Sequence, residues 1–509
     1  MKTIPARPTV RKPILLAASR LLATLHRWLG MALGLVFALW FASGTVLSFV
    51  PFPALGRWER LSGAEALALK EVRVAPAIAL TAGVQFPIDQ LRLINVAGQP
   101  RYVLAATGQS LVSVSATGGE ILGPVSPETA RTIAERFSAL AAEQVDGPFD
   151  YDQWTVHGGY DPYRPFYRVS MADAEGTELY VSVRSGEVVQ RTRKFERAWN
   201  WVGAVVHWLN PTIIRKHEAV WHATLWTIAL VAITVPLAGI LVGLVRLVNL
   251  KRSARPGLSP FRGWLRWHHT IGLFGGIFVL SWVTSGWLSL DRGRIFSPES
   301  PSQAQIQRLR GISMAEAVGA FSTSYLGGVE TAREIEFSAI GARPLAIIRG
   351  GSPRSSLIDL VDPAGAHTVS RALPDDLLLA AVSSAWSPAT PLEISAVARN
   401  DAYAGPRSNP LPASTRRIRL DDPSGTWVHV DAESGQVLSI LDNSRRAYRW
   451  LVDGLHTFDF PLLNEAGALW HVLLVMATTT GFALSFTAVV LAIKRLRPVK
   501  RRERSGTGT

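Results

Sequence analysis

The sequence predicts an α-helical membrane protein whose four transmembrane helices form two parallel internal repeats, each carrying an α+β domain outside the cytoplasm. Three observations support this fold class. Four long segments lack formal charge, basic residues gather beside the ends of those segments, and the second half of the chain repeats residues of the first. The chain has 509 residues and no cysteine, which excludes disulfides and cysteine-ligated metal clusters.

Each uncharged segment is long enough to cross a bilayer, whose hydrocarbon core is spanned by a helix of about 20 apolar residues. The expected helices occupy residues 28–56, 223–245, 270–290 and 469–493. The first segment is longer than the apolar part of a signal peptide and recurs later in the chain, so we interpret it as a retained helix.

Basic residues mark one side of the membrane. Residues 1–27, 246–266 and 494–509 together hold 19 Lys or Arg and one acidic residue, whereas the rest of the chain is slightly acidic. Basic residues beside spans stay in the cytoplasm. The net charge of +14 therefore records topology and predicts contact with a lipid bilayer, with no nucleic-acid partner.

This charge distribution assigns the remaining segments. The chain begins and ends in the cytoplasm, and the two long segments lie outside it. The cytoplasmic segments are 1–27, 246–269 and 494–509, the outer domains are 57–205 and 291–450, and the segments along the outer interface are 206–222 and 451–468.

The second half of the chain repeats the first at two fixed offsets. Each unit enters the membrane, carries an outer domain and returns, so the two units are parallel repeats related by an axis along the membrane normal. An offset of 242 matches His26 with His268, Gly30 with Gly272, Gly34 with Gly276, Trp40 with Trp282, and Ser43-Gly44 with Ser285-Gly286. An offset of 249 matches Ser185-Gly186 with Ser434-Gly435, Arg197 with Arg446, His207 with His456, and Trp221-His222 with Trp470-His471.

The outer segments show strand and helix patterns in the same order. Alternating residues near 166–170 and 179–189, and again near 417–421 and 426–438, predict antiparallel hairpins closed by a Ser-Gly turn. Helical patterns precede them at 127–143 and 313–325, the second with the capping box Ser313-Met-Ala-Glu316. Each half is therefore expected to carry a small α+β domain.

Three of these motifs resemble the PepSY-associated transmembrane family. They are Leu25-His-Arg-Trp-Leu-Gly at the opening of a span, the hairpin with its Ser-Gly turn, and the Arg-x-x-x-Trp…His segment that leads into the returning helix. The resemblance covers both halves. It implies PepSY-like periplasmic domains and a multi-pass protein of the bacterial inner membrane. It also implies a link to iron uptake and the reduction of ferric siderophores.

Six of the eleven histidines form three repeat-related pairs. His26 and His268 are expected at the cytoplasmic ends of the first and third helices. His222 and His471 are expected at the outer ends of the second and fourth, with His207 and His456 just before them in aromatic segments. Interfacial histidines can simply anchor helices. Histidines in or near spans are also frequently functional, and paired repeats would bring them to equal depth.

An axial imidazole is what a non-covalent b-type haem requires, and two make a low-spin electron carrier. We therefore expect two haems. His26 and His268 would ligate one near the inside, and either His222 with His471 or His207 with His456 would ligate the other near the outside. The absence of cysteine excludes covalent attachment and iron–sulfur clusters.

The resulting hypothesis is a di-haem b oxidoreductase that passes electrons across the membrane to a periplasmic ferric chelate, with no catalytic side chain of its own. The chain lacks a G-x-G-x-x-G fingerprint, so the electron donor is either membrane quinol or a partner carrying flavin or nicotinamide. Two alternatives remain. One is a non-enzymatic membrane protein that binds peptides or regulates a protease or sensor. The other is a haem-bearing subunit of a separate oxidoreductase.

Overall fold

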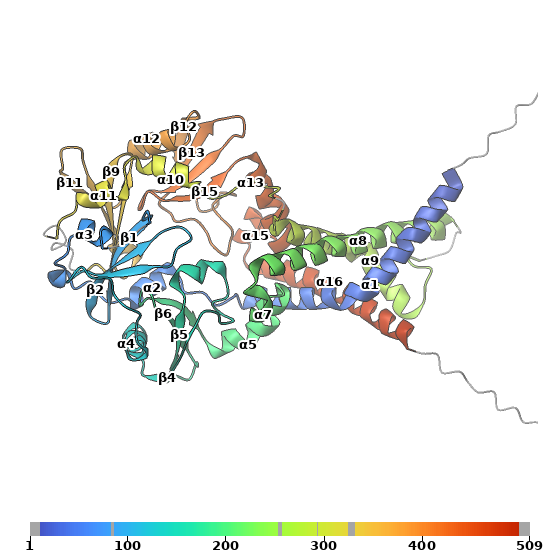
Figure 1. The fold of residues 1–509 in the computed structure, drawn as a ribbon. Helices are drawn as coiled ribbons and strands as arrows, with labels where there is room; N and C mark the ends of the chain where they lie inside the picture. Colours follow the sequence, from blue (N-terminus) through green and yellow to red (C-terminus); the bar gives the residue numbers. More distant parts are fainter. Residues whose placement is uncertain (1–10, 83–85, 253–256, 293, 324–330, 498–509) are drawn as a thin grey trace, which may run out of the picture.

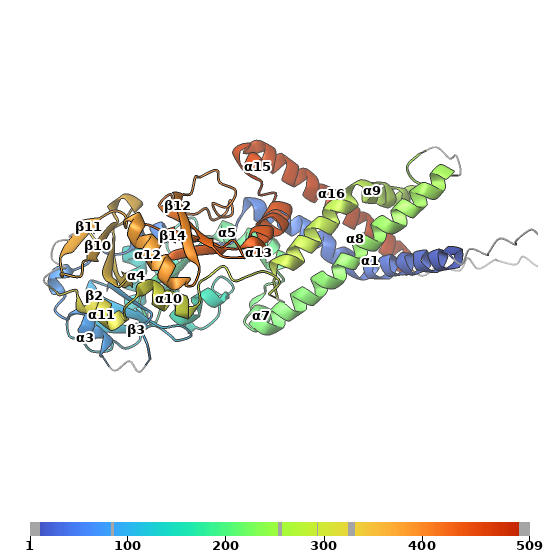
Figure 2. The same cartoon turned by 90° about the horizontal axis from the view of Figure 1, so that it is seen from above.

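The computed structural model describes residues 11–82, 86–252, 257–292, 294–323 and 331–497. The molecule is elongated: all its β-sheets gather at one end, and four long helices run together away from them (Figure 1). A layer of short helices connects the two parts (Figure 2).

The four long helices are α1 (Arg11–Phe49), α8 (Glu218–Arg252), α9 (Gly263–Ser289) and α16 (Ala468–Leu496). Each is long and apolar enough to cross a membrane, so the chain is a membrane protein with four candidate spans in the part the structure describes. The start of α1, the end of α16 and the ends of α8 and α9 nearest their connecting loop lie far from the sheets (Figure 1). We call this the basic end of the bundle, because Arg20, Arg27, Lys494 and Arg495 lie there.

The first long helix differs in position from the expected 28–56. It begins earlier, at Arg11, and ends at Phe49. Residues 51–56 are not helical. Pro51 and Pro53 explain this end, since proline lacks the N–H that a continuing helix needs and restricts the residue before it.

Short helices precede each returning span. The first set is α5 (Lys194–Val202), α6 (Ala204–His207) and α7 (Thr212–Arg215); the second is α13 (Asn443–Tyr448), the π-helical η5 (Arg449–Gly454), α14 (Leu455–Thr457) and α15 (Pro461–Glu465). At equivalent places the helical register breaks, once at Gly203 and once in η5. Both breaks come just before a histidine, His207 or His456.

The central sheet has seven antiparallel strands in the order β11-β10-β9-β8-β1-β2-β3. The strands are β1 (Gln90–Val96), β2 (Gln99–Ala105), β3 (Val112–Ser115), β8 (Glu334–Ile340), β9 (Arg343–Arg349), β10 (Leu357–Val361) and β11 (His367–Ser370). Strands β1 and β8 pair directly, with Leu93 opposite Ile335. The two outer segments therefore share one continuous sheet. The sequence had predicted two separate domains and no sheet that joins them.

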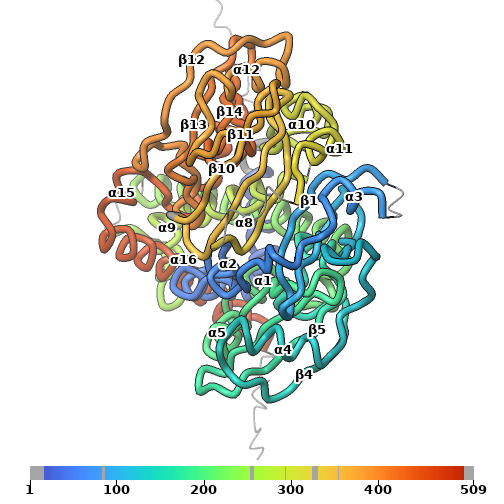
Figure 3. Tube along the Cα trace, turned by 90° about the vertical axis from the view of Figure 1, so that its left-hand side faces the viewer, coloured from blue at the N-terminus to red at the C-terminus, as the bar shows by residue number. Residues whose placement is uncertain are grey.

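Two four-stranded antiparallel sheets, each in sequential order, flank the central one (Figure 3). They consist of β4 (Ala142–Phe149), β5 (Phe166–Met171), β6 (Glu178–Ser182) and β7 (Val188–Thr192), and of β12 (Thr390–Ala396), β13 (Thr415–Asp421), β14 (Trp427–Asp431) and β15 (Val437–Leu441). The turns after β6 and β14 place Gly186 and Gly435 at φ +74° and +70°, which glycine adopts without strain.

Helices fill the spaces between the sheets. Helix α4 (Pro127–Ser138) packs with β5, β6 and one face of β1, whereas α12 (Asp375–Ala385) packs with β13, β14 and β9. The opposite face of the central sheet is covered by α3 (Pro76–Leu80) and α11 (Met314–Gly319). Both hydrogen bonds of the capping box predicted at Ser313 and Glu316 are present. The remaining short elements are α2 (Arg57–Gly63), η1 (Leu69–Glu71), η2 (Gly158–Tyr163), α10 (Gln303–Arg310) and η4 (Pro353–Ser355).

Candidate functional site

His26 and His268 meet inside the helix bundle. Helix α1 lies beside α8 and α16, and α9 lies beside the same two helices, so α1 and α9 stand diagonally across the bundle. The imidazole of His26 on α1 and that of His268 on α9 have ring centroids 5.9 Å apart and planes inclined at 41°. We call these two residues the basic-end pair. Facing side chains of a helical bundle are a common place for a cofactor.

Hydrogen bonds orient both rings of this pair in the same way. The Nδ1 atom of His26 lies 2.9 Å from the carbonyl oxygen of Val235, which can only accept, so Nδ1 carries the proton. The Nδ1 atom of His268 lies 2.9 Å from the hydroxyl of Thr487, which itself donates to the Leu484 carbonyl. Each ring thus keeps Nε2 as its lone-pair nitrogen, the arrangement that metal-ligating histidines adopt.

His207 and His456 form a second pair at the end of the bundle nearest the sheets, which we call the sheet-end pair. Their ring centroids are 6.2 Å apart and their planes are inclined at 61°. They extend from α6 and α14, which pack against α1 and α9 respectively. The register breaks at Gly203 and in η5 lie just before His207 and His456, so each histidine follows an interruption of the helix.

The two rings of the sheet-end pair have matching surroundings. The Nδ1 atom of His207 lies 3.1 Å from the Trp40 carbonyl and 3.2 Å from the Ser43 hydroxyl. For His456 the corresponding distances, to the Trp282 carbonyl and the Ser285 hydroxyl, are 3.2 and 3.1 Å. A carbonyl requires a donor, so Nδ1 carries the proton and Nε2 is again the lone-pair nitrogen.

Glycines make room for three of these four rings. A Cβ at Gly44 or Gly286 would lie 3.1 Å from Cε1 of His207 or His456, and a Cβ at Gly239 would lie 2.5 Å from Cε1 of His26. Atoms as close as 2.5 Å cannot coexist without movement, so Gly239 on α8 must remain a glycine for His26 to keep this position. The repeated Ser-Gly dipeptide hinted at Gly44 and Gly286, but no pattern in the sequence pointed to Gly239.

The centroid separation in both pairs is compatible with one metal ion between the two imidazole rings. Metal–imidazole bonds are about 2 Å long, so two rings on opposite sides of one iron have centroids about 6 Å apart once the ring radius is added. The observed 5.9 and 6.2 Å match this value. Within the described residues no group of three or more His, Cys, Asp or Glu could hold a metal. Each pair would supply two imidazole nitrogens, the number of protein ligands that a low-spin b-type haem takes.

The third predicted pair is not brought together. The Nε2 atom of His222 lies 2.8 Å from the carbonyl of Leu290 at the end of α9. The ring of His471 stacks on Phe49 at the end of α1, with centroids 5.7 Å apart, and its Nδ1 lies 3.1 Å from the Gly467 carbonyl. Each of these histidines thus faces the end of a neighbouring helix.

The space between the two pairs is apolar and rich in aromatic rings. On α1, Ser43 lies 17 positions after His26, which is roughly 26 Å at 1.5 Å per residue. The buried residues along this length include Phe37, Phe41, Val279, Trp282 and Val283. Trp282 packs on Phe41 at 5.3 Å and on Phe458 at 5.5 Å, and its N–H donates to the His456 carbonyl at 2.7 Å.

A cluster of charged side chains joins the two outer segments. It was not predicted from the sequence. Glu334 on β8 accepts from Arg60 and Arg92 of the first half and from Arg349 of the second. Arg92 also pairs with Glu187 through two hydrogen bonds, of 2.6 and 2.9 Å. Burial alone would raise the pKa of Glu334, but the three guanidinium groups hold this pKa well below its usual range.

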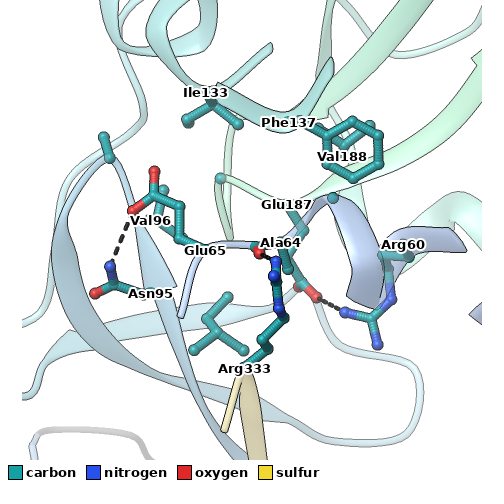
Figure 4. A pocket seen from close by; sticks show the side chains of 14 residues that line it. Arg60, Ala64, Glu65, Asn95, Val96, Ile133, Phe137, Glu187, Val188 and Arg333 are labelled. Atoms are coloured by element: carbon teal, nitrogen blue, oxygen red, sulfur yellow. Dashed lines mark hydrogen bonds and ion pairs between the residues drawn. The ribbon is translucent and has the colours of Figure 1, made fainter. Parts of the chain in front are cut away.

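A small cavity of about 50 Å³ adjoins this cluster. Arg60 and Glu187 face each other at its edge, and Glu65 accepts a hydrogen bond from the Asn95 amide (Figure 4). Its volume accommodates about one or two water molecules, too little for an organic ligand. We therefore assign the charged cluster a structural role, in fastening the first outer segment to the second.

No curated protein matches the chain. The family model for the PepSY-associated transmembrane region matches residues 23–300. This stretch holds most of α1, all of α8 and α9, the first outer segment and the histidines His26, His207, His222 and His268. Because the match covers more than half of the 509 residues, the chain belongs to the PepSY-associated transmembrane family.

Proposed function

We propose that this protein is a membrane oxidoreductase that binds two b-type haems and conducts electrons from one side of a bacterial inner membrane to an acceptor on the other. The observation that carries the proposal is the presence of two histidine pairs, one near each end of the bundle, with centroid separations of 5.9 and 6.2 Å. Haem supplies the reversible one-electron chemistry that such a transfer requires.

The residues of each pair have defined tasks in this proposal. His26 and His268 hold one haem and His207 and His456 hold the other, each through Nε2. The acceptors at Nδ1, which include the carbonyls of Val235, Trp40 and Trp282, fix the tautomer and the ring plane. His222 and His471 are assigned no ligand role, because each contacts the end of a neighbouring helix.

The direction of transfer follows from the charge distribution. Basic residues stay on the cytoplasmic side, so we assign the basic end of the bundle, with the start of α1 and the end of α16, to the cytoplasmic side. The sheets are then periplasmic, and the sheet-end pair lies nearest the acceptor. The two halves are interpreted as parallel repeats, which is consistent with the matching surroundings of His207 and His456 and the equal strand order of the two flanking sheets.

A ferric chelate, such as a ferric siderophore, is the proposed acceptor. The support for this choice is the resemblance to family members linked to ferric-siderophore reduction. Each ferric ion takes up one electron, and the ferrous product binds hard oxygen ligands less tightly, so reduction releases iron from the chelate.

An absorption spectrum of the full-length protein, purified in detergent from cells well supplied with haem, tests the proposal directly. We expect a Soret band and about two haems per chain by pyridine haemochrome assay. The double variant H26A/H268A should lose one haem, and H207A/H456A should lose the other. The matched control H222A/H471A, which also removes two histidines, should keep both.

Three outcomes would redirect the assignment. A protein without a Soret band despite ample haem would refute the proposal and favour a non-enzymatic, peptide-binding or regulatory role. Loss of haem in H222A/H471A but not in H207A/H456A would refute the ligand assignment. Two haems together with a tightly co-purifying soluble oxidoreductase would identify the chain as a subunit of that enzyme.

A further inference from the structure

An apolar groove runs along the outside of the bundle near its basic end. It lies between α9 and α16 and has a volume of about 380 Å³, within the range of about 300–1,000 Å³ typical of small-molecule sites. Its lining residues are Gly263, Trp264, Trp267, Ile271, Ala483, Phe486 and Thr487. Trp267 is 62% exposed on a membrane-length helix, so the groove opens sideways, where lipid surrounds the bundle.

One lining residue of this groove, Thr487, also forms a hydrogen bond with His268 of the basic-end pair. Thr487 is 4% exposed, and its Oγ1 lies 2.9 Å from Nδ1 of His268. The Thr487 hydroxyl donates to the Leu484 carbonyl and accepts from the imidazole, so one lone pair of its oxygen stays available. A molecule in the groove can therefore reach the proposed haem ligand through a single hydrogen-bonding residue.

The lining selects among the molecules that could donate electrons here. A flavin or nicotinamide nucleotide carries a large polar ribose–phosphate part, whereas the lining is mostly apolar and includes no Lys or Arg among its seven residues. An acyl chain would fit the apolar walls but has no group to pair with Thr487. A quinol has a flat ring to pack against Trp264 and Phe486, an O–H to donate to Thr487, and an apolar tail to leave through the lipid-facing opening.

We infer that this groove binds a membrane quinol as the electron donor, an inference that rests on the proposed function. Oxidation breaks both O–H bonds of the quinol. Two protons leave towards the aqueous phase at the basic end, and two electrons leave singly towards the basic-end pair. The terminal oxidant is ferric iron at the opposite side, so one quinol converts two ferric ions to ferrous ions and becomes quinone.

Photolabelling of the full-length protein in nanodiscs tests the site. The probe is a short-tailed benzoquinone that carries an azido group on its ring. Mass spectrometry after illumination should find the label on peptides containing 263–271 and 483–487. Excess decylubiquinone should suppress it. Filling the groove with I271W should reduce labelling at least about tenfold, a loss equivalent to about 1.4 kcal/mol of binding. The control I277W places the same bulk on the same helix at an exposed position outside the lining and should label as the native chain does.

Haem spectra of the same samples separate the inference from the proposed function. If two haems are present and dithionite reduces them, but the quinone probe labels neither peptide, the donor assignment is overturned while the proposed function stands. Equal labelling by a photoreactive acyl-chain lipid that decylubiquinone does not displace would show a lipid groove and also overturn it. Specific labelling in a protein without haem would show quinone binding but refute the donor role.

Discussion

Gly239→Ala should weaken one of the two proposed haem sites and spare the other. A Cβ at this position would lie 2.5 Å from Cε1 and 2.8 Å from Nδ1 of His26, whereas ordinary contact begins at 3.4 Å. The His26 ring must therefore move away by about 1 Å, which strains the 2.9 Å hydrogen bond from its Nδ1 to the Val235 carbonyl. Overpacking costs about 1–3 kcal/mol and a lost hydrogen bond about 0.5–1.5 kcal/mol. A combined cost of about 2–4 kcal/mol corresponds to a roughly 30- to 1,000-fold loss of haem affinity.

Titration of purified protein with haemin, followed by the pyridine haemochrome assay, measures this effect. We expect the variant to saturate near one haem per chain where the native chain takes two. Gly30→Ala is the matched control, since its Cβ would meet only Val235 Cγ1, at an ordinary 3.8 Å, one turn from His26. Retention of both haems at native affinity by Gly239→Ala would refute the placement of His26, and loss in the control would show that any added methyl disturbs the bundle.

Three further changes have defined outcomes. Glu334→Gln should destabilise the protein by about 3–5 kcal/mol in chemical unfolding, because buried guanidinium groups lose their shared partner, whereas Glu393→Gln in an exposed pair should cost under about 1 kcal/mol. The pKa of Glu334 in the folded protein is held below its usual 4.5. The stabilisation of the fold by ionised Glu334 is therefore fully present above pH 4.5 and should be lost as the pH falls further. Burial raises the pKa of Asp453 to about 6 from 3.8. Its contribution to the stability of the fold is therefore greatest below pH 3.8 and is lost as the pH rises through 6. Asp453→Asn should remove this pH dependence when thermal unfolding is measured over a series of pH values. Trp282→Phe removes the N–H that donates to the His456 carbonyl and should cost about 1 kcal/mol, with spectral change confined to the sheet-end haem.

The sequence was sufficient for the spans because a bilayer imposes a length and a polarity that local residues must satisfy. The residue matches between the two halves carried more information than either half alone. If the halves are parallel repeats, His26 and His268 are equivalent residues at the same end of each unit, and the geometry of two related halves brings them to one depth. Their rings do meet, on diagonal helices of the bundle.

The choice between the other two pairs could not be made from sequence. His222 and His471 begin long helices, but helical periodicity does not say which neighbour a side chain will face, and these two face the ends of α9 and α1. His207 and His456 follow register breaks whose direction depends on packing against α1 and α9. The pairing of β1 with β8 joins residues about 240 positions apart, and no local pattern encodes a contact of that range.

The distance between the basic-end pair and the sheet-end pair favours the transfer of electrons through the bundle over the transfer of ions. About 26 Å of apolar helix is a costly route for an ion, since a charged group in the bilayer centre requires polar partners. The buried polar side chains of the bundle are hydroxyls and His269, among the residues the structure describes. Electrons face no such desolvation cost when redox groups sit at both ends, and Phe41 and Trp282 occupy the space between. Trp282 also donates a hydrogen bond to the backbone carbonyl of His456, so this tryptophan also positions one of the proposed haem ligands. Substitutions at Phe41 should therefore alter the rate of electron transfer between the two proposed haem sites without changing the haem content. Substitutions at Trp282 should alter both the transfer rate and the haem content.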